Sequence, residues 1–214
     1  PLGGKSVQYA SATGTGNFGA GAGQIVVLPD VEIPAGGYYL VGLAGGANGG
    51  PLPTPDASGT INMSGSAGKV VLADTPTSLG CNGGNNACSP AQQALILDLV
   101  GFGNANFFEG SAPAPATSNS TSILRAGDGC TDTNDNVADF ATGVPAPRNS
   151  ASIPNVCGGG GTLYISIGDA SGAEGNSGTT PFFLTISLNQ PAGPDGVSFD
   201  YAIADGTATA ADSD

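Results

Sequence analysis

The segment Asp128–Asp139, with the sequence DGCTDTNDNVAD, places oxygen-bearing side chains at a spacing that could bind a cation. Asp132, Asn134 and Asn136 stand at alternate positions, which is how an EF-hand calcium loop begins. Two features differ from such a loop, because Val137 stands where it needs glycine and no glutamate occupies its twelfth position. Asp and Asn also form Asx-turns with the backbone. The segment is therefore either a Ca²⁺ site or a series of turns, and the two differences favour turns.

Cysteines form the second group of reactive side chains, at Cys81, Cys88, Cys130 and Cys157. An even number of cysteines in a chain rich in Gly and Asn and poor in Lys indicates disulfides and an oxidising, extracellular compartment. Three pairings are possible, and we favour Cys81–Cys88, which closes the loop CNGGNNAC, together with Cys130–Cys157. The alternative is a zinc site with four cysteine ligands. The absence of any C-x₂-C pair and of histidine disfavours it.

Catalytic arrangements are poorly represented in this sequence. The chain has no histidine and no tryptophan, which excludes nucleophile–base pairs of the Ser–His kind. Pairs of carboxylates remain conceivable, but nothing in the sequence places two of them in one apolar cleft. We therefore expect a protein without enzymatic activity.

The charge balance excludes further classes of partner. Seventeen acidic residues against four basic ones give a net charge of −13. Nucleic acids and anionic membrane surfaces are both bound through clustered Lys and Arg, so neither partner is expected. No apolar run approaches the roughly 20 residues that cross a bilayer, so membrane insertion is not expected either. The chain starts at Pro1 without Met or an apolar leader, and we interpret it as a mature, processed or excised form of a secreted protein.

The elements that must position these side chains are short β-strands. The 37 Gly and 16 Pro break helices and favour turns, while the apolar residues cluster in short runs. The only helix predicted is Ser89–Ala94, in which Ser89 is the cap and Pro90 the first helical residue. The chain is thus predicted to be all-β, with strands over residues 6–10, 24–28, 38–43, 70–72, 95–100, 122–125, 163–167, 182–188 and 197–203.

Five stretches of the first region together resemble a bacterial lamin tail domain, which is an immunoglobulin-like β-sandwich. They lie between Ser6 and Ser152 and read SVQYASATGTGNF, LPDVEIPAGGYYLV, LILDLVGFGNANFFEGSAPAPATSNSTSILR, CTDTNDNVADF and PAPRNSAS. Members of this family usually carry a Trp where Lys5 stands, and they begin with one or two further strands upstream of Leu2. The resemblance implies an immunoglobulin-like β-sandwich over residues 1–157 that lacks its opening strands.

The second region resembles the first half of a Calx-beta domain, another β-sandwich. The matching stretches are ISIGDASGAEGNSGTT and LTISLNQPAGPDGVSFDYAIADGTATA. Calx-beta domains that bind Ca²⁺ use an early Glu and the Asp that closes the DGTA segment. The resemblance therefore implies Glu174 and Asp214 as metal ligands, with Asp212 nearby. Two or three carboxylates do not complete a shell of six to eight oxygens, so an acidic turn and a solvated C-terminus are the alternative. We expect no other cofactor.

Both resemblances are partial, and together they lead to a hypothesis about function. The run GGGG at 158–161 is predicted to be a linker between a domain at 1–157 and a set of strands at 162–214 from a partial second β-sandwich. A sandwich without its first strands exposes unpaired backbone groups and an apolar groove, which the surplus strands of another copy could fill. Such contacts are heterologous and form open polymers.

We therefore expect a non-enzymatic, secreted structural or adhesive protein that assembles with copies of itself into a filament or surface layer. The alternative is a fragment of a longer secreted multidomain protein. In that protein the two regions would be calcium-rigidified adhesion spacers or an accessory domain of an extracellular hydrolase.

Overall fold

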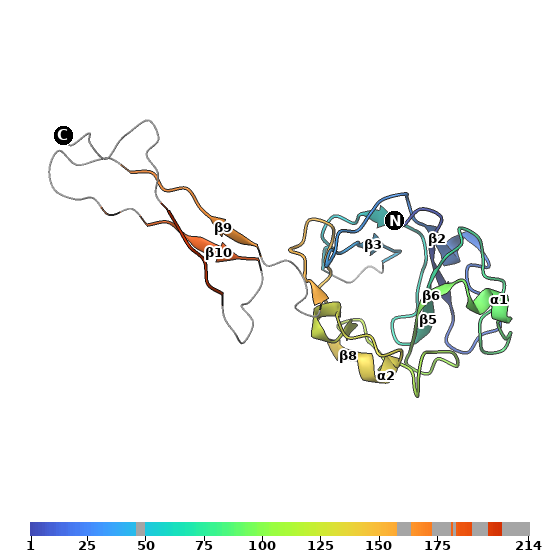
Figure 1. The fold of residues 1–214 in the computed structure, drawn as a ribbon. Coiled ribbons are helices and arrows are strands. Elements are labelled where there is room, and N and C mark those ends of the chain that lie inside the picture. The colour runs from blue at the N-terminus through green and yellow to red at the C-terminus, as the bar shows by residue number, and fades with distance from the viewer. Residues whose placement is uncertain (46–49, 158–163, 173–180, 182, 190–196, 203–214) are drawn as a thin grey trace, which may run out of the picture. The chain divides into compact units, whose positions relative to one another are not determined.

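The computed structural model describes residues 1–45, 50–157, 164–172, 181, 183–189 and 197–202. The chain forms two compact units, Pro1–Gly158 and Gly159–Asp214, which are drawn in Figure 1. The regular elements of the described residues are short strands in mostly antiparallel sheets, and the helices are single turns. The prediction of an all-β fold is confirmed, whereas the immunoglobulin-like arrangement stays a prediction.

Unit 1 is built on an antiparallel sheet of four strands in the order β2-β1-β5-β6. The sequence GKVVLA of β5 is almost continuously apolar because both of its faces are covered. Lys69 and Val71 are fully buried on one face, while Val70 lies on the other and pairs with Val100 of β6. The bounds of the four strands in sheet order are Ile25–Val27, Ser6–Ala10, Gly68–Ala73 and Ile96–Phe102.

A second layer of unit 1 consists of two separate two-stranded ribbons. β3 (Val41–Gly42) pairs in parallel with β4 (Ala57–Ser58). β7 (Ser122–Arg125) pairs antiparallel with β8 (Phe140–Gly143). No described strand joins one ribbon to the other.

The two ribbons pack on different parts of the four-stranded sheet. Ile61, which follows β4, is fully buried and packs with Tyr9 of β1 and Val26 of β2. Arg125 at the end of β7 instead donates to Asp98 of β6, with nitrogen–oxygen distances of 2.9 and 3.1 Å. The β3–β4 ribbon therefore lies over the β2 side of the sheet, and the β7–β8 ribbon lies over the β6 side.

The opposite face of the sheet carries the main apolar core. Phe18, Val71 and Leu99 are buried there together with the disulfide Cys81–Cys88. Burial of an apolar side chain contributes about 1.5–3 kcal/mol, so this cluster is a major source of stability.

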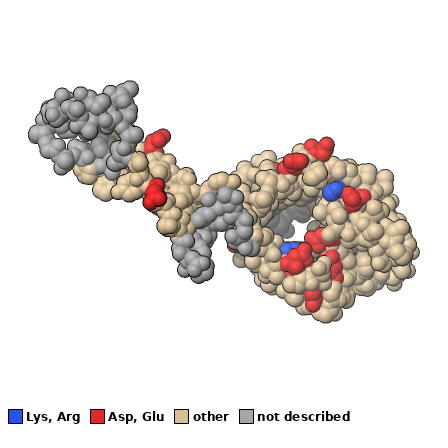
Figure 2. Space-filling model, viewed as in Figure 1, with Lys and Arg blue, Asp and Glu red and all other residues tan. Residues whose placement is uncertain are grey.

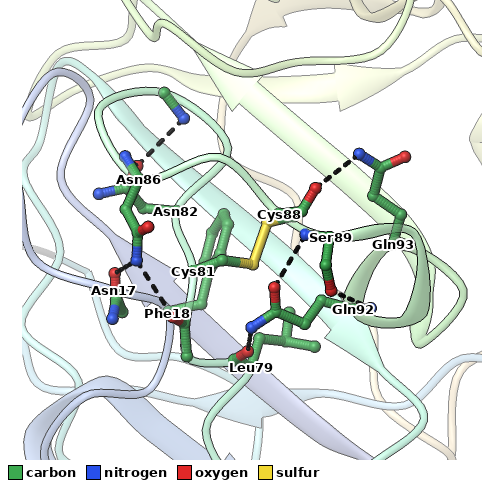
Figure 3. Close-up of a disulfide and its surroundings, with 12 residues drawn as sticks. Asn17, Phe18, Leu79, Cys81, Asn82, Asn86, Cys88, Ser89, Gln92 and Gln93 are labelled. Atoms are coloured by element: carbon green, nitrogen blue, oxygen red, sulfur yellow. Dashed lines mark hydrogen bonds between the residues drawn. A yellow bond between two sulfur atoms is a disulfide. The ribbon is translucent and has the colours of Figure 1, made fainter.

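Helix α1 (Pro90–Gln93) lies beside this disulfide, as Figure 3 shows. Ser89 Oγ accepts a hydrogen bond from the Gln92 N–H, and Gln92 Oε1 accepts one from the Ser89 N–H. This capping box and the proline at the first helical position start the helix, as the sequence predicted. The single turns α2 (Asn136–Asp139), η1 (Ala22–Gln24) and η2 (Gly127–Gly129) were not predicted.

Unit 2 contains one antiparallel pair among its described residues, formed by β9 (Ile165–Ile167) and β10 (Ile186–Leu188). These strands lie inside the segments predicted at 163–167 and 182–188. The strand predicted at 197–203 is not present over its described part, residues 197–202. The alternation of apolar and polar residues in this segment was therefore insufficient to predict a strand. No helix among the residues described in either unit is long and apolar enough to cross a membrane.

The outer edge of β6 is closed by a side chain together with an isolated backbone bridge from Ala114, which bonds Gly101 and Gly103. Asn136 is fully buried, and its Oδ1 accepts a hydrogen bond of 2.8 Å from the Gly101 N–H. Its Nδ2 donates to the Leu99 carbonyl at 2.9 Å. The side-chain amide thus makes the two hydrogen bonds that a neighbouring strand would make, and it blocks strand addition at these residues.

Replacing Asn136 by alanine would leave the buried Gly101 N–H and Leu99 carbonyl without partners. Because each unsatisfied group costs about 1–3 kcal/mol, we expect N136A to lower the free energy of unfolding by about 2–4 kcal/mol. Urea unfolding followed by circular dichroism measures this change. N104A, at an exposed asparagine in a nearby turn, is the control and should change the value by less than about 0.5 kcal/mol. Equal effects of the two substitutions would contradict the edge-closing role.

Candidate functional site

The space between the two ribbons of the second layer forms a groove over the middle of the four-stranded sheet. Its apolar part has a volume of about 440 Å³. Val70, Val100 and Phe102 of the sheet line it from below, while Leu43, which follows β3, and Ile123 of β7 line its two sides. No residue that lines this part carries a charge. Figure 2 shows a hollow in the surface of unit 1.

A more polar part with a volume of about 990 Å³ extends the groove along the same two segments. Tyr38 lies on the side of β3, Arg125 lies on the side of β7, and Ile123 lines both parts. The groove thus runs between residues 36–44 and residues 121–125. From here on, "the groove" means both parts together.

The groove interrupts what would otherwise be a continuous sheet. Among the described strands, β3 is paired only with β4, and β7 only with β8. A β-strand has backbone donors and acceptors at both edges, so the edge of each strand that points away from its partner requires other partners. Ser122 Oγ, on β7, is buried without a hydrogen-bond partner within the described part of the chain, and Ser122 lines the groove. This site therefore offers an apolar floor between β7 and the residues on either side of β3, and neither strand has a second partner among the described strands.

A segment that we call the strap, residues 145–157, ties the two borders of the groove together without adding a strand. Near its end the Asn155 N–H donates to the Gly36 carbonyl, just before β3, at 2.8 Å. Cys157 forms a disulfide with Cys130, which follows β7. The structure thus pairs the cysteines as the sequence favoured, and the second disulfide fixes the strap beside the groove.

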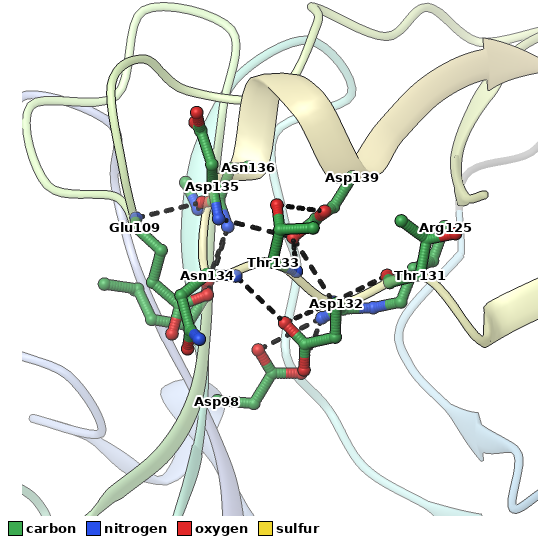
Figure 4. A network of polar contacts seen from close by, with 12 residues as sticks. Asp98, Glu109, Arg125, Thr131, Asp132, Thr133, Asn134, Asp135, Asn136 and Asp139 are labelled. Carbon is green, nitrogen blue, oxygen red and sulfur yellow. Dashed lines mark hydrogen bonds and ion pairs between the residues drawn. The ribbon is translucent and has the colours of Figure 1, made fainter. Parts of the chain in front are cut away.

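Arg125 organises the polar end of the groove, as Figure 4 shows. Besides its contact with Asp98, its Nη1 lies 3.1 Å from Asp132 and 3.8 Å from Asp139. Its guanidinium carbon lies 4.6 Å from the centre of the Phe140 ring. One cation therefore joins β6, β7, β8 and the turn before α2, and the three carboxylates more than balance its charge.

The environment of the cluster shifts the pKa values of two carboxyl groups in opposite directions. Burial alone would raise the pKa of Asp139, but hydrogen bonds from Thr133 and the Asp135 N–H, together with the charge of Arg125, bring that pKa below its ordinary value. Burial and the neighbouring charge of Asp98 raise the pKa of Glu109. The folded state therefore favours an ionised Asp139.

The structure does not bring Asp132, Asn134 and Asn136 together around one point. Asp132 Oδ1 faces Arg125 and accepts a hydrogen bond of 3.3 Å from the Asn134 N–H, which is an Asx-turn. The Asn136 amide is bonded to β6 instead. In the part of the chain that the structure describes, no group of three or more Cys, Asp or Glu could hold a metal ion. The hydrogen bonds of this segment therefore agree with the turn interpretation, and Ca²⁺ binding by it stays a prediction.

The other predicted metal ligands, Glu174, Asp212 and Asp214, lie outside the described residues. Sequence reasoning missed the pairing of Arg125 with Asp98. A signal was present, since an arginine that ends an apolar strand in a chain with four basic residues requires a partner.

Comparison with known proteins gives no relative: no family model, no curated protein and no solved structure matches this chain. The resemblances to lamin tail and Calx-beta domains therefore stay predictions.

The lowered pKa of Asp139 predicts acid sensitivity. A carboxyl group whose pKa is lower in the folded than in the unfolded protein stabilises the fold above its ordinary value of 3.8, and this contribution is lost as the pH falls through the folded pKa. We expect the free energy of unfolding to decrease below about pH 5, and D139N to reduce the slope of that decrease. Urea unfolding between pH 3 and 7 measures it. D30N, at an exposed residue, is the control, and identical slopes in D139N and the parent would contradict the role of Asp139.

Proposed function

We propose that this chain is a non-enzymatic extracellular structural protein whose copies assemble by sharing β-strands. The observation that carries the proposal is the interrupted second layer of unit 1. Two ribbons lie on one sheet, and β3 and β7, on the two sides of the groove, each pair with one other strand among the described residues.

The chemistry of the groove favours a β-strand over a small molecule as the occupant. A small-molecule site usually combines an apolar pocket with a few convergent polar side chains. Here the apolar part is lined by uncharged residues, and the charged side chains Arg125 and Arg148 of the polar part are engaged by Asp98 and Asp128 of the fold itself. An added strand would satisfy the unpaired backbone groups and cover the apolar floor at the same time.

Strand sharing of this kind leads to polymers. The acceptor groove belongs to unit 1, and a donor strand must come from another part of a second copy, so the contact is heterologous. Heterologous contacts continue from copy to copy unless the rotation closes a ring. The product is a filament or a surface layer.

An extracellular location is supported by the two disulfides, because such bonds form and persist in oxidising compartments. The absence of histidine and the acidic charge of the chain support a structural role rather than catalysis or nucleic-acid binding.

Lysine substitutions on the two faces of β7 test whether the groove is the acceptor of the shared strand. Ile123 lines both parts of the groove, whereas the neighbouring Leu124 lines only the polar part and is 39% exposed. We expect I123K to abolish polymers because an added strand would bury an unpaired charge, while L124K still polymerises. Sedimentation and electron microscopy of the purified proteins measure this, and circular dichroism checks that both variants are folded.

Polymers of I123K equal to those of the parent protein would exclude the groove as the acceptor. A parent protein that stays a monomer at all concentrations would contradict the proposed function and leave the alternative, a module of a longer secreted protein.

A further inference from the structure

The β9–β10 ribbon of unit 2 has one apolar face and one polar face. Its register pairs Ile186 with Ile167 and Leu188 with Ile165, so these four side chains point to the same side. Ser187 pairs with Ser166 and points to the other side. A two-stranded ribbon therefore carries a continuous aliphatic face opposite a face of serines.

The aliphatic face is exposed to solvent. The exposed fractions of Ile165, Ile167, Ile186 and Leu188 are 37%, 57%, 44% and 38%. An isolated two-stranded ribbon is at best marginally stable in water, and three or more strands with a covered apolar face are needed for independent stability. Among the described residues of unit 2 this face stays partly exposed, so a further apolar surface would stabilise the ribbon.

We propose that the β9–β10 ribbon of one copy occupies the groove between β3 and β7 of a second copy. This inference rests on the proposed function and names the donor of the shared strands. The aliphatic face would pack on Val70, Val100 and Phe102, and the serine face would remain in water. The two outer edges of the ribbon would pair with β3 and β7, which turns the two ribbons of the second layer into one continuous sheet.

The length of the β9–β10 ribbon agrees with the length of the groove. Backbone hydrogen bonds from Gly168 to Thr185 at 2.9 Å and from Asn189 to Tyr164 at 3.2 Å extend the ribbon by one residue at each end. Each strand of the ribbon then spans five residues, 164–168 and 185–189, or about 16 Å. The border of the groove on the side of β7 is also five residues long, from Thr121 to Arg125.

Charge supports it as well. Neither strand of the ribbon contains a charged residue, and no charged residue lines the apolar part of the groove. Packing the ribbon into the groove would therefore bury no charged side chain in an apolar environment. Burial of an unpaired charge would be costly.

The test compares single lysine substitutions in the full chain. I167K charges the aliphatic face, and S166K places the same charge on the serine face of the same strand. We expect S166K to polymerise like the parent and I167K to require at least about tenfold higher concentration, because only I167K would bury the charge. Analytical ultracentrifugation measures this, and circular dichroism checks the fold. If I167K polymerises like the parent, the ribbon is not the donor, although the proposed function stands.

Mixing the two defective variants tests whether the ribbon enters a second copy. I123K keeps an intact ribbon and I167K keeps an intact groove, so an equimolar mixture should form complexes of two chains that neither variant forms alone. Absence of these complexes would overturn the proposal. If the parent itself does not polymerise, the proposed function fails together with the inference.

Engineered disulfides locate the contact. We expect L124C combined with S166C or S187C to link separate chains on mild oxidation, because Leu124 lies on the face of β7 opposite Ile123, and both serines would point to that side of the completed sheet. L97C, on β6 outside the groove, combined with the same partners is the control and should give no such links. A link within one chain, seen as a monomer with altered gel mobility, would overturn the assignment to a second copy.

Discussion

Every strand edge in a β-protein carries backbone donors and acceptors that must find partners, and this requirement organises the whole of unit 1. At the outer edge of β6 the side-chain amide of Asn136 bonds the Leu99 carbonyl and the Gly101 N–H, and the backbone of Ala114 bonds the next groups along the edge. At β3 and β7 each strand has a partner on one side, and the groove lies between them. The protein thus closes one edge internally and leaves two neighbouring edges beside an apolar floor.

The charge distribution leaves backbone and apolar contacts as the means of assembly. All four basic side chains are engaged within unit 1: Lys5 with Asp74, Lys69 with Asn82 and Asn106, Arg125 with Asp98, and Arg148 with Tyr38 and Asp128. The remaining acidic excess makes copies repel one another at long range, which favours solubility. Short-range strand pairing and burial must overcome that repulsion, and salt reduces it.

Much of this architecture could be predicted from the sequence. The helix at Ser89 follows from local capping chemistry, and both disulfides follow from the short loop between Cys81 and Cys88 and the remaining pair. The strands of β5 and β7 follow from clustered apolar residues. Each of these signals is local in the sequence, so it can be interpreted without knowledge of the tertiary structure.

The rest depends on contacts between distant segments. The spacing of Asn136 from Asp132 allowed either a cation loop or turns, with turns favoured, but the position of Asn136 over β6, 35 residues away in sequence, decides its role. The groove lies between residues 36–44 and residues 121–125, which are far apart in the sequence. No local sequence pattern therefore predicts it. The resemblance to a sandwich without its first strands did lead to the expectation of an open groove, but not to its borders.

The most direct test of the central claim is amide hydrogen exchange of the parent protein as a function of its concentration. The account predicts that the amides of Val41, Leu43, Ile123 and Arg125, which point away from β4 and β8, exchange fast in dilute protein and become protected as copies assemble, while those of β5 are protected throughout. Protection of these outward-pointing amides that is already complete in the dilute monomer would contradict it.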